Sequence, residues 1–217
     1  MMLRLADKMS RLGTETAFDV LARAETLSHE GRDIINLGIG QPDFKTPEHI
    51  VEAAIKALHD GHHGYTPSPG IPQLRESVAQ NLVNYRGVNI APDRIVVVPG
   101  GKVTMFFAIL MFGEPGVDIL YPNPGFPIYQ SVIEFTGARA VPVQLLEENN
   151  FSFDADTILS QITKDTRLLI LNSPANPTGG TASKVEIDRL VSGLTDSHPQ
   201  VAVLSDEIYS RITYDNE

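Results

Sequence analysis

The sequence contains no cysteine among its 217 residues. The chain therefore forms no disulfide, presents no thiolate nucleophile and holds no cysteine-ligated metal. It also lacks a long apolar run, because the longest, residues 105–112, is far shorter than the roughly 20 residues that cross a membrane. The opening stretch MMLRLADKMS carries charges where a signal peptide needs an apolar core. These absences predict a soluble protein of the cytoplasm with no membrane partner.

Positive charge is scarce as well: 17 lysines and arginines stand against 27 aspartates and glutamates, a net charge of −10. Such a surface repels phosphate backbones, so we expect no nucleic-acid partner. Hydrophobic residues make up 42% of the sequence. A chain of this length and composition can bury a core as one globular domain, or as one domain with a small appendage.

Two kinds of apolar pattern follow each other along the chain. Helical spacing predicts helices over 16–30, over 72–86 and from Thr46 onward, with Pro47 in the first helical position. From residue 93, short apolar runs alternate with helical patterns. The predicted strands are 94–98, 117–121, 138–143, 167–172 and 201–205, and the predicted helices between them are 102–112, 127–136 and 183–194.

This alternation predicts a parallel sheet covered by helices on both faces. The helix 102–112 is apolar almost all round, which predicts that it lies deep inside the domain. We also expect five such strands, as part of a larger sheet, to leave an uncovered apolar edge.

Unusual residues gather where the predicted strands end. They are Gly100-Gly101, Phe126, Asn176, Asp206 and Tyr209. Each alone has an ordinary explanation: a tight turn, a core aromatic, a side chain bonded to its own turn, or a helix cap. Because ligands of open α/β sheets bind beyond the carboxyl ends of the strands, we expect these residues to share one crevice. A glycine cradle, an aromatic face, an amide, a carboxylate and a phenol together suit a flat pyridine ring that carries a phosphate.

Other familiar motifs do not match. VVVPGGKV is not a phosphate-binding Walker loop, and GIGQPD has Asp43 where a dinucleotide fingerprint needs glycine. SDE lacks the turn of a serine hydrolase. His59, His62 and His63 have a spacing that brings two imidazoles together, but Asp60 is the only evident carboxylate beside them, so we expect no metal site.

The motifs as a set resemble the class I/II aminotransferases, a family of fold-type I enzymes that use pyridoxal 5'-phosphate (PLP). The matching stretches, in the family's order, are NLGIGQPDF, GYTPSPGIPQLRESVA, VVPGGK, YPNPGFPIYQSV, LNSPANPTGG and SDEIYSRITYD. The resemblance implies a three-layer α/β/α large domain with a mostly parallel sheet, incomplete here. It assigns residues 1–45 to an N-terminal arm and a helical segment of the small domain. Residues 46–217 become a partial PLP-binding large domain.

The resemblance also assigns roles to the cofactor side of the site. Gly100, Gly101 and Lys102 match the loop whose backbone holds the PLP phosphate, and Phe126 matches the aromatic residue stacked on the pyridine ring. Val98 departs from the family, which often has serine or threonine there. That change removes one hydroxyl and leaves the backbone donors in place.

Further roles follow at the polar end. Asn176 and Tyr209 match the pair that bonds the ring's 3-hydroxyl, and Asp206 matches the partner of the pyridine nitrogen. Gly40 and Asn176 match positions near the substrate carboxylate. Tyr65 matches a tyrosine that reaches the phosphate of the neighbouring subunit, which implies a homodimer.

In this family the lysine that forms a Schiff base with PLP lies beyond the DEIY corner, later than Glu217. We therefore expect an N-terminal portion truncated before that lysine, with no catalytic residue of its own. Such a chain binds PLP non-covalently at best and is inactive alone. Of its six lysines only Lys102 comes near the expected site, and its side chain starts at the phosphate end of the cofactor.

The expected function is amino-group transfer from an amino acid to a 2-oxo acid by a PLP-dependent enzyme of amino-acid metabolism. Two alternatives stay open at this point. One is a PLP-dependent C–S lyase of the same fold, because the residues that distinguish the two reactions lie mostly beyond 217. The other is a non-catalytic fragment that binds PLP or phosphate and acts with a partner chain.

Overall fold

The computed structural model describes residues 4–13, 16–38 and 40–214. The chain divides into two compact units, one made of Met1–Glu15 and Gly100–Glu217 and the other of Thr16–Pro99. In the described ranges no helix has both the length and the apolar character needed to cross a membrane.

The unit of residues 16–99 is helical. Its elements are α1 (Thr16–His29), α2 (Glu48–His59), α3 (Pro72–Arg86) and the short η2 (Pro92–Arg94). Helix α3 begins at a proline, whose missing N–H costs nothing in the first turn. Gly87, in the left-handed region, caps its C-terminal end. Arg75 on α3 donates to the carbonyls of Pro92 and Ile95, which holds the following turn against the helix. The three helices predicted here are confirmed to within about two residues, but Pro47 is the N-cap of α2 and not its first residue.

The strand predicted at 94–98 is wrong in this structure. Ile95 has extended dihedral angles, but within the described residues the segment pairs with no strand. Val96 and Val97 are 63% and 39% exposed. The amide of Val97 donates to the Pro69 carbonyl, a single loop contact in place of a ladder. Apolar β-branched residues favour an extended backbone, but a strand also needs a neighbour to pair with.

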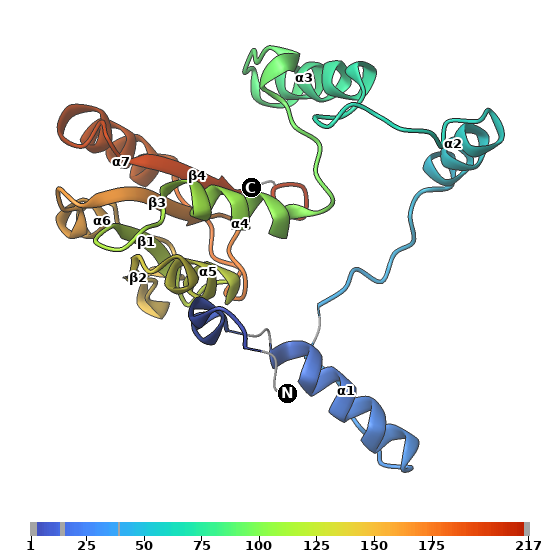
Figure 1. Cartoon of the computed structure of the whole chain (residues 1–217), viewed down its shortest axis with the longest axis horizontal. Helices are drawn as coiled ribbons and strands as arrows, with labels where there is room; N and C mark the ends of the chain where they lie inside the picture. The colour runs from blue at the N-terminus through green and yellow to red at the C-terminus, as the bar shows by residue number, and fades with distance from the viewer. Residues whose placement is uncertain (1–3, 14–15, 39, 215–217) are drawn as a thin grey trace. The chain divides into compact units, whose positions relative to one another are not determined.

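The other unit contains a parallel sheet in the order β2-β1-β3-β4 (Figure 1). The strands are β1 (Asp118–Asn123), β2 (Arg139–Gln144), β3 (Thr166–Asn172) and β4 (Ala202–Asp206). All three pairings are parallel, as predicted. β4 forms one edge, and Val203 on it is 47% exposed. The expected uncovered edge is therefore present in the described chain.

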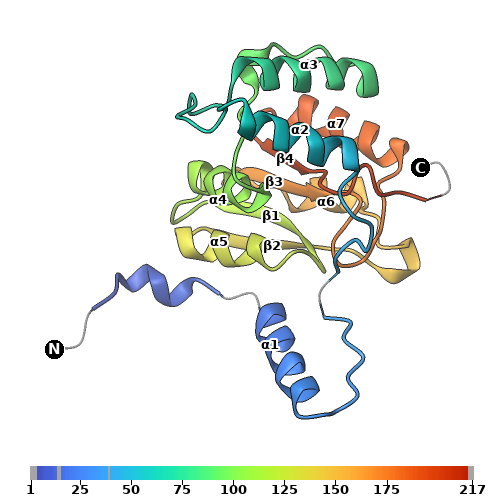
Figure 2. The same cartoon turned by 90° about the vertical axis from the view of Figure 1, so that its right-hand side faces the viewer.

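Helices cover both faces of this sheet (Figure 2). On one face lie α4 (Gly101–Phe112) and α5 (Ile128–Thr136), which pack on Ile119, Leu168 and Ile170. On the other lie α6 (Ala155–Gln161) and α7 (Lys184–Ser197), which pack on Leu120 and Leu169. Successive strand residues point to opposite faces, so each strand serves both cores. Ser183 caps α7, as predicted, by accepting from the Glu186 amide.

Helix α4 is less enclosed than its composition predicts. Met105 and Ile109, one turn apart, are buried against the sheet side. Phe107 and Met111 lie on the opposite side and are 59% and 74% exposed. The expectation that this helix lies deep inside is wrong for that side, because none of the helices and strands described in its own unit covers it.

The N-terminal segment is tied to α5. Its short helix η1 (Asp7–Arg11) ends with Arg11, which donates to the carbonyls of Glu134 and Phe135 at 2.9 and 3.2 Å. These carbonyls belong to the last turn of α5, where a cation is favourable.

Asp118 is a buried charge at the start of β1, only 4% exposed. Its carboxylate accepts from the Arg139 guanidinium at 2.6 and 2.5 Å and from the Thr163 hydroxyl at 2.8 Å. The Arg139 hydrogen bonds hold the pKa of Asp118 below its usual 3.8, although burial acts in the opposite direction. A lowered folded-state pKa stabilises the fold above the unfolded-state pKa, and this contribution is lost as the pH falls through the folded-state value.

We predict that Asp118→Asn lowers the free energy of unfolding at neutral pH by about 1.5–3 kcal/mol, the range for hydrogen bonds to buried charged groups. The difference from the parent shrinks below about pH 4, where the parent carboxylate takes up a proton. Urea denaturation at several pH values measures both. Asp188→Asn is the control, because Asp188 pairs with Lys184 on an exposed helix face. We expect this substitution to lower the free energy of unfolding by at most about 0.5 kcal/mol. Equal losses in the two variants would contradict this account.

Candidate functional site

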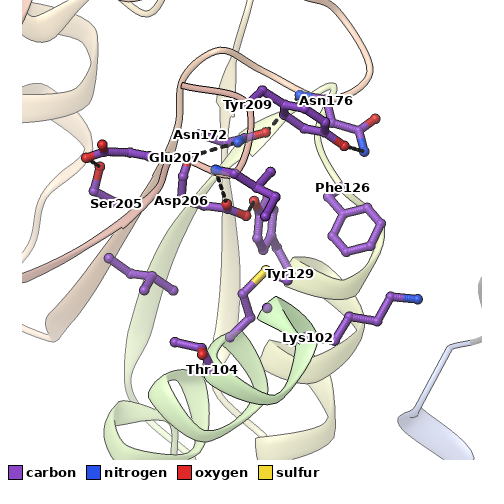
Figure 3. A pocket seen from close by; sticks show the side chains of 14 residues that line it. Lys102, Thr104, Phe126, Tyr129, Asn172, Asn176, Ser205, Asp206, Glu207 and Tyr209 are labelled. Atoms are coloured by element: carbon purple, nitrogen blue, oxygen red, sulfur yellow. Dashed lines mark hydrogen bonds between the residues drawn. The ribbon is translucent and has the colours of Figure 1, made fainter. Parts of the chain in front are cut away.

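A cavity of about 390 Å³ opens at the carboxyl ends of β3 and β4, beside the first turns of α4 and α5 (Figure 3). The residues predicted from the sequence that line it are Gly101, Lys102, Phe126, Asn176, Asp206 and Tyr209. They come from four separate segments of the chain, which parallel strands bring to one edge of the sheet. Gly40 and Tyr65 belong to the other unit, in which both are exposed, and their roles stay predictions.

Asp206 is the last residue of β4 and lies on the wall of the cavity. One carboxylate oxygen, Oδ2, accepts from the Tyr129 hydroxyl at 2.6 Å. The other, Oδ1, accepts from the Ile208 amide at 3.3 Å. The carboxylate is therefore held from two sides, which offsets part of the cost of shielding its charge partly from water.

Asn176 and Tyr209 lie together on the same wall, near Asn172 (Figure 3). The Asn176 side-chain amide donates to the Tyr209 hydroxyl at 3.3 Å. A side-chain amide and a phenol at this spacing can both bond an oxygen placed beside them.

Helix α4 begins at the cavity with two glycines. Gly100 is the N-cap at φ 93°, a conformation that favours glycine, and it provides no side-chain cap for the first amides. Those amides, with the positive end of the helix dipole, are suited to an anion. Gly100 itself stands next to the cavity, and Gly101 is on its wall. The Lys102 ammonium lies 5.7 Å from the centre of the Phe126 ring.

Sequence reasoning missed Tyr129 and Asn172. Tyr129 is fully buried in the first turn of α5, three residues after Phe126, so a helical spacing from Phe126 is the signal that points to it. Burial, then the hydrogen bond to Asp206, raises the pKa of Tyr129 far above its usual value. Asn172 is buried at the end of β3, and a polar residue that closes an apolar run is its only signal.

The residues present fit a flat cofactor with a phosphate and a ring nitrogen. The cavity has the size of a small-molecule site. It offers uncapped helix amides for an anion, an aromatic ring, and a carboxylate of the kind that pairs with a protonated nitrogen. In the described ranges, no three His, Cys, Asp or Glu side chains gather into a metal site.

A parallel sheet with helices on both faces and a cavity at its carboxyl edge is the arrangement in which α/β proteins bind ligands. Comparison with known proteins then gives the family. Residues 32–217 match the family described as aminotransferase class I and II. The chain belongs to this family, which generally depends on PLP, and its predicted fold class is confirmed.

Relatives agree with this assignment. The aspartate aminotransferase of Bacillus subtilis is 32% identical over 98% of this chain and 53% of its own length. The structure of aspartate aminotransferase from Thermus thermophilus with maleate matches with a TM-score of 0.93 at 33% identity, over 100% of this chain and 56% of that one. An alanine aminotransferase from Pyrococcus furiosus matches with a TM-score of 0.90 at 32% identity, over 99% and 55%. The chain thus spans about half the length of these relatives.

Gly180 lets the loop that carries Asn176 close. A Cβ added to Gly180 would lie 2.6 Å from the Phe151 carbonyl oxygen and 2.8 Å from that of Asn150, both backbone atoms. Asn150 and Phe151 already have positive φ angles of 52° and 56°, so their backbone has little room to adjust.

We predict that Gly180→Ala lowers the free energy of unfolding by about 1–3 kcal/mol. Urea denaturation measures this. Gly64→Ala is the matched control, because a Cβ there meets nothing within 4 Å, and we expect a change within about 0.5 kcal/mol. A Gly180→Ala variant as stable as the control would show that this contact is not tight.

Proposed function

We propose that the chain is the N-terminal portion of a PLP-dependent aminotransferase, an enzyme that moves the amino group of an amino acid to a 2-oxo acid. The observation that carries this proposal is the Asp206 carboxylate, held by Tyr129 and Ile208 on the wall of a cavity that also contains Phe126 and the start of α4. The names of the relatives, which are aminotransferases, favour this reaction over C–S bond cleavage.

Each cavity residue has a role in this proposal. The amides of Gly100, Gly101 and Lys102 bind the phosphate at the start of α4. Phe126 stacks on the pyridine ring, Asp206 keeps its nitrogen protonated, and Asn176 with Tyr209 binds the 3-hydroxyl. When bound, the protonated ring withdraws electrons from the substrate α-carbon.

The remaining assignments are part of the same proposal. Gly40 and Asn176 lie near the substrate carboxylate, and Tyr65 from a neighbouring subunit reaches the phosphate in a homodimer. Tyr65 is fully exposed in the described chain, as a residue that contacts a second subunit is expected to be. Residues 1–45 form the arm and small-domain segment, residues 46–217 form part of the large domain, and the protein acts in the cytoplasm.

We further propose that the amino donor has an acidic side chain, such as aspartate. Several relatives are named aspartate aminotransferases, and one of their structures holds the dicarboxylate maleate. Among the described residues that line the cavity, Lys102 is the only lysine or arginine. We therefore propose that its backbone amide binds the phosphate while its ammonium reaches the second carboxylate.

The cofactor assignment predicts saturable binding of one PLP per chain, followed by absorbance or calorimetry. Asp206→Asn replaces the charge that pairs with the ring nitrogen, and we expect about tenfold or greater loss of affinity. Asp188→Asn, on the exposed face of α7, is expected to bind as the parent does.

Equal affinity of the Asp206 variant and the parent would contradict the proposed site. Loss of affinity in both aspartate variants would point to net charge rather than to this carboxylate.

The donor assignment predicts that the PLP-loaded chain binds maleate about tenfold or more tightly than acrylate, which lacks the second carboxylate. We expect Lys102→Met to weaken maleate binding more than acrylate binding, so the ratio of the two affinities falls. Titration calorimetry gives both affinities. Equal binding of the two acids would contradict an acidic donor.

A further inference from the structure

Tyr129 connects the two side chains that the proposed function assigns to the pyridine ring. Its hydroxyl donates to Asp206 Oδ2 at 2.6 Å, across 77 positions of sequence. Its ring meets the Phe126 ring edge-on, with centroids 6.0 Å apart and planes at 82°. Figure 3 shows the three side chains on the cavity wall, with the hydroxyl of Tyr129 turned to the carboxylate. One buried residue therefore contacts both the aromatic face and the charge.

An ordinary explanation is that Tyr129 is a core residue whose hydroxyl has found an acceptor. Its ring is indeed fully buried with Val132 and Ile133. Phenylalanine would fill that position without bringing a polar group into the core, so the hydroxyl stabilises the fold little by itself. Its acceptor, however, is the one carboxylate that the proposed site depends on. The hydroxyl therefore also fixes the position of the Asp206 carboxylate, which a role in core packing alone does not require.

The electrostatics determine which group donates. Burial and the nearby carboxylate raise the pKa of Tyr129, so its hydroxyl keeps its proton at neutral pH and donates to Asp206. A hydrogen bond given to a carboxylate stabilises the ionised form. The Ile208 amide fixes the other oxygen, so the hydroxyl of Tyr129 completes the orientation of the group. The other charged or titratable groups that line the cavity are Lys102, Glu207 and Tyr209.

We propose that Tyr129 is a positioning residue, which holds the Asp206 carboxylate turned toward the ring nitrogen of bound PLP. The inference rests on the proposed function. Without the hydroxyl, Oδ2 loses this hydrogen bond and the carboxylate is free to rotate. A rotated carboxylate pairs less well with the ring nitrogen, so that nitrogen holds its proton less firmly.

The test uses the chain loaded with PLP that carries ¹⁵N in its pyridine ring. The ¹⁵N chemical shift reports directly whether that nitrogen is protonated, and it is followed over a range of pH. In Tyr129→Phe we expect the ratio of protonated to neutral ring to fall about tenfold at a given pH. We also expect PLP affinity to fall about three- to tenfold.

Tyr121→Phe is the matched control. Tyr121 is a buried tyrosine on β1, 8% exposed, and it does not line the cavity. Its variant loses a hydroxyl from the same core, and we expect the ring nitrogen to titrate as in the parent. In the background of Asp206→Asn, adding Tyr129→Phe is expected to change the ring nitrogen no further, because the effect passes through the carboxylate.

A folded Tyr129→Phe variant whose ring nitrogen titrates as in the parent would overturn the positioning role and leave the proposed function intact. A parent chain that binds no PLP would overturn the proposed function, and this inference with it. If Tyr129→Phe does not fold, 3-fluorotyrosine at position 129 keeps the shape and makes the hydroxyl a stronger donor. The ring nitrogen should then be more protonated, and an unchanged shift would equally overturn the role.

Discussion

The side-chain amide of Asn172 joins three parts of the candidate site. Its Nδ2 donates to the Asp206 carbonyl at 3.0 Å and to the Pro174 carbonyl at 3.2 Å, and its Oδ1 accepts from the Asn176 amide at 2.8 Å. Parallel pairing places Asn172 directly beside Asp206 in the sheet. A buried amide with both ends bonded costs little, whereas one left unpaired is expensive. The positions of Asp206 and Asn176 therefore depend on one residue that does not itself need to touch a ligand.

The two hydrophobic cores support this arrangement from opposite faces of the sheet. Leu168 and Ile170 of β3 face α4 and α5, whereas Leu169 between them faces α6 and α7. Slipping β3 by one residue would exchange its two faces, so packing determines the register that brings the strand ends together. The first turns of α4 and α5 are then carried to the same edge. The cavity is in this way built on the packed sheet.

Much of this arrangement could be predicted from the sequence, for physical reasons. Buried parallel strands leave continuous apolar runs, and their carboxyl ends meet at one edge, so Phe126, Asn176 and Asp206 were predicted to share a cavity that the structure confirms. Helix α6 was missed, since seven residues are too few for a clear period. The segment 94–98 has the composition of a strand, but it pairs with no strand in the described chain. Strand pairing depends on residues elsewhere in the chain, so local composition does not predict it. Tyr129 and Asn172 look like core positions, because a hydroxyl or amide that acts through another residue leaves no motif.

The most direct test of the central claim is a crystal structure of the chain grown with PLP. The account predicts a ring against Phe126, its nitrogen facing the Asp206 carboxylate, and its phosphate at the first amides of α4. Tyr129 should still donate to Asp206 in that structure. A cofactor bound elsewhere, or a cavity of these residues that stays empty at saturating PLP, would contradict the account.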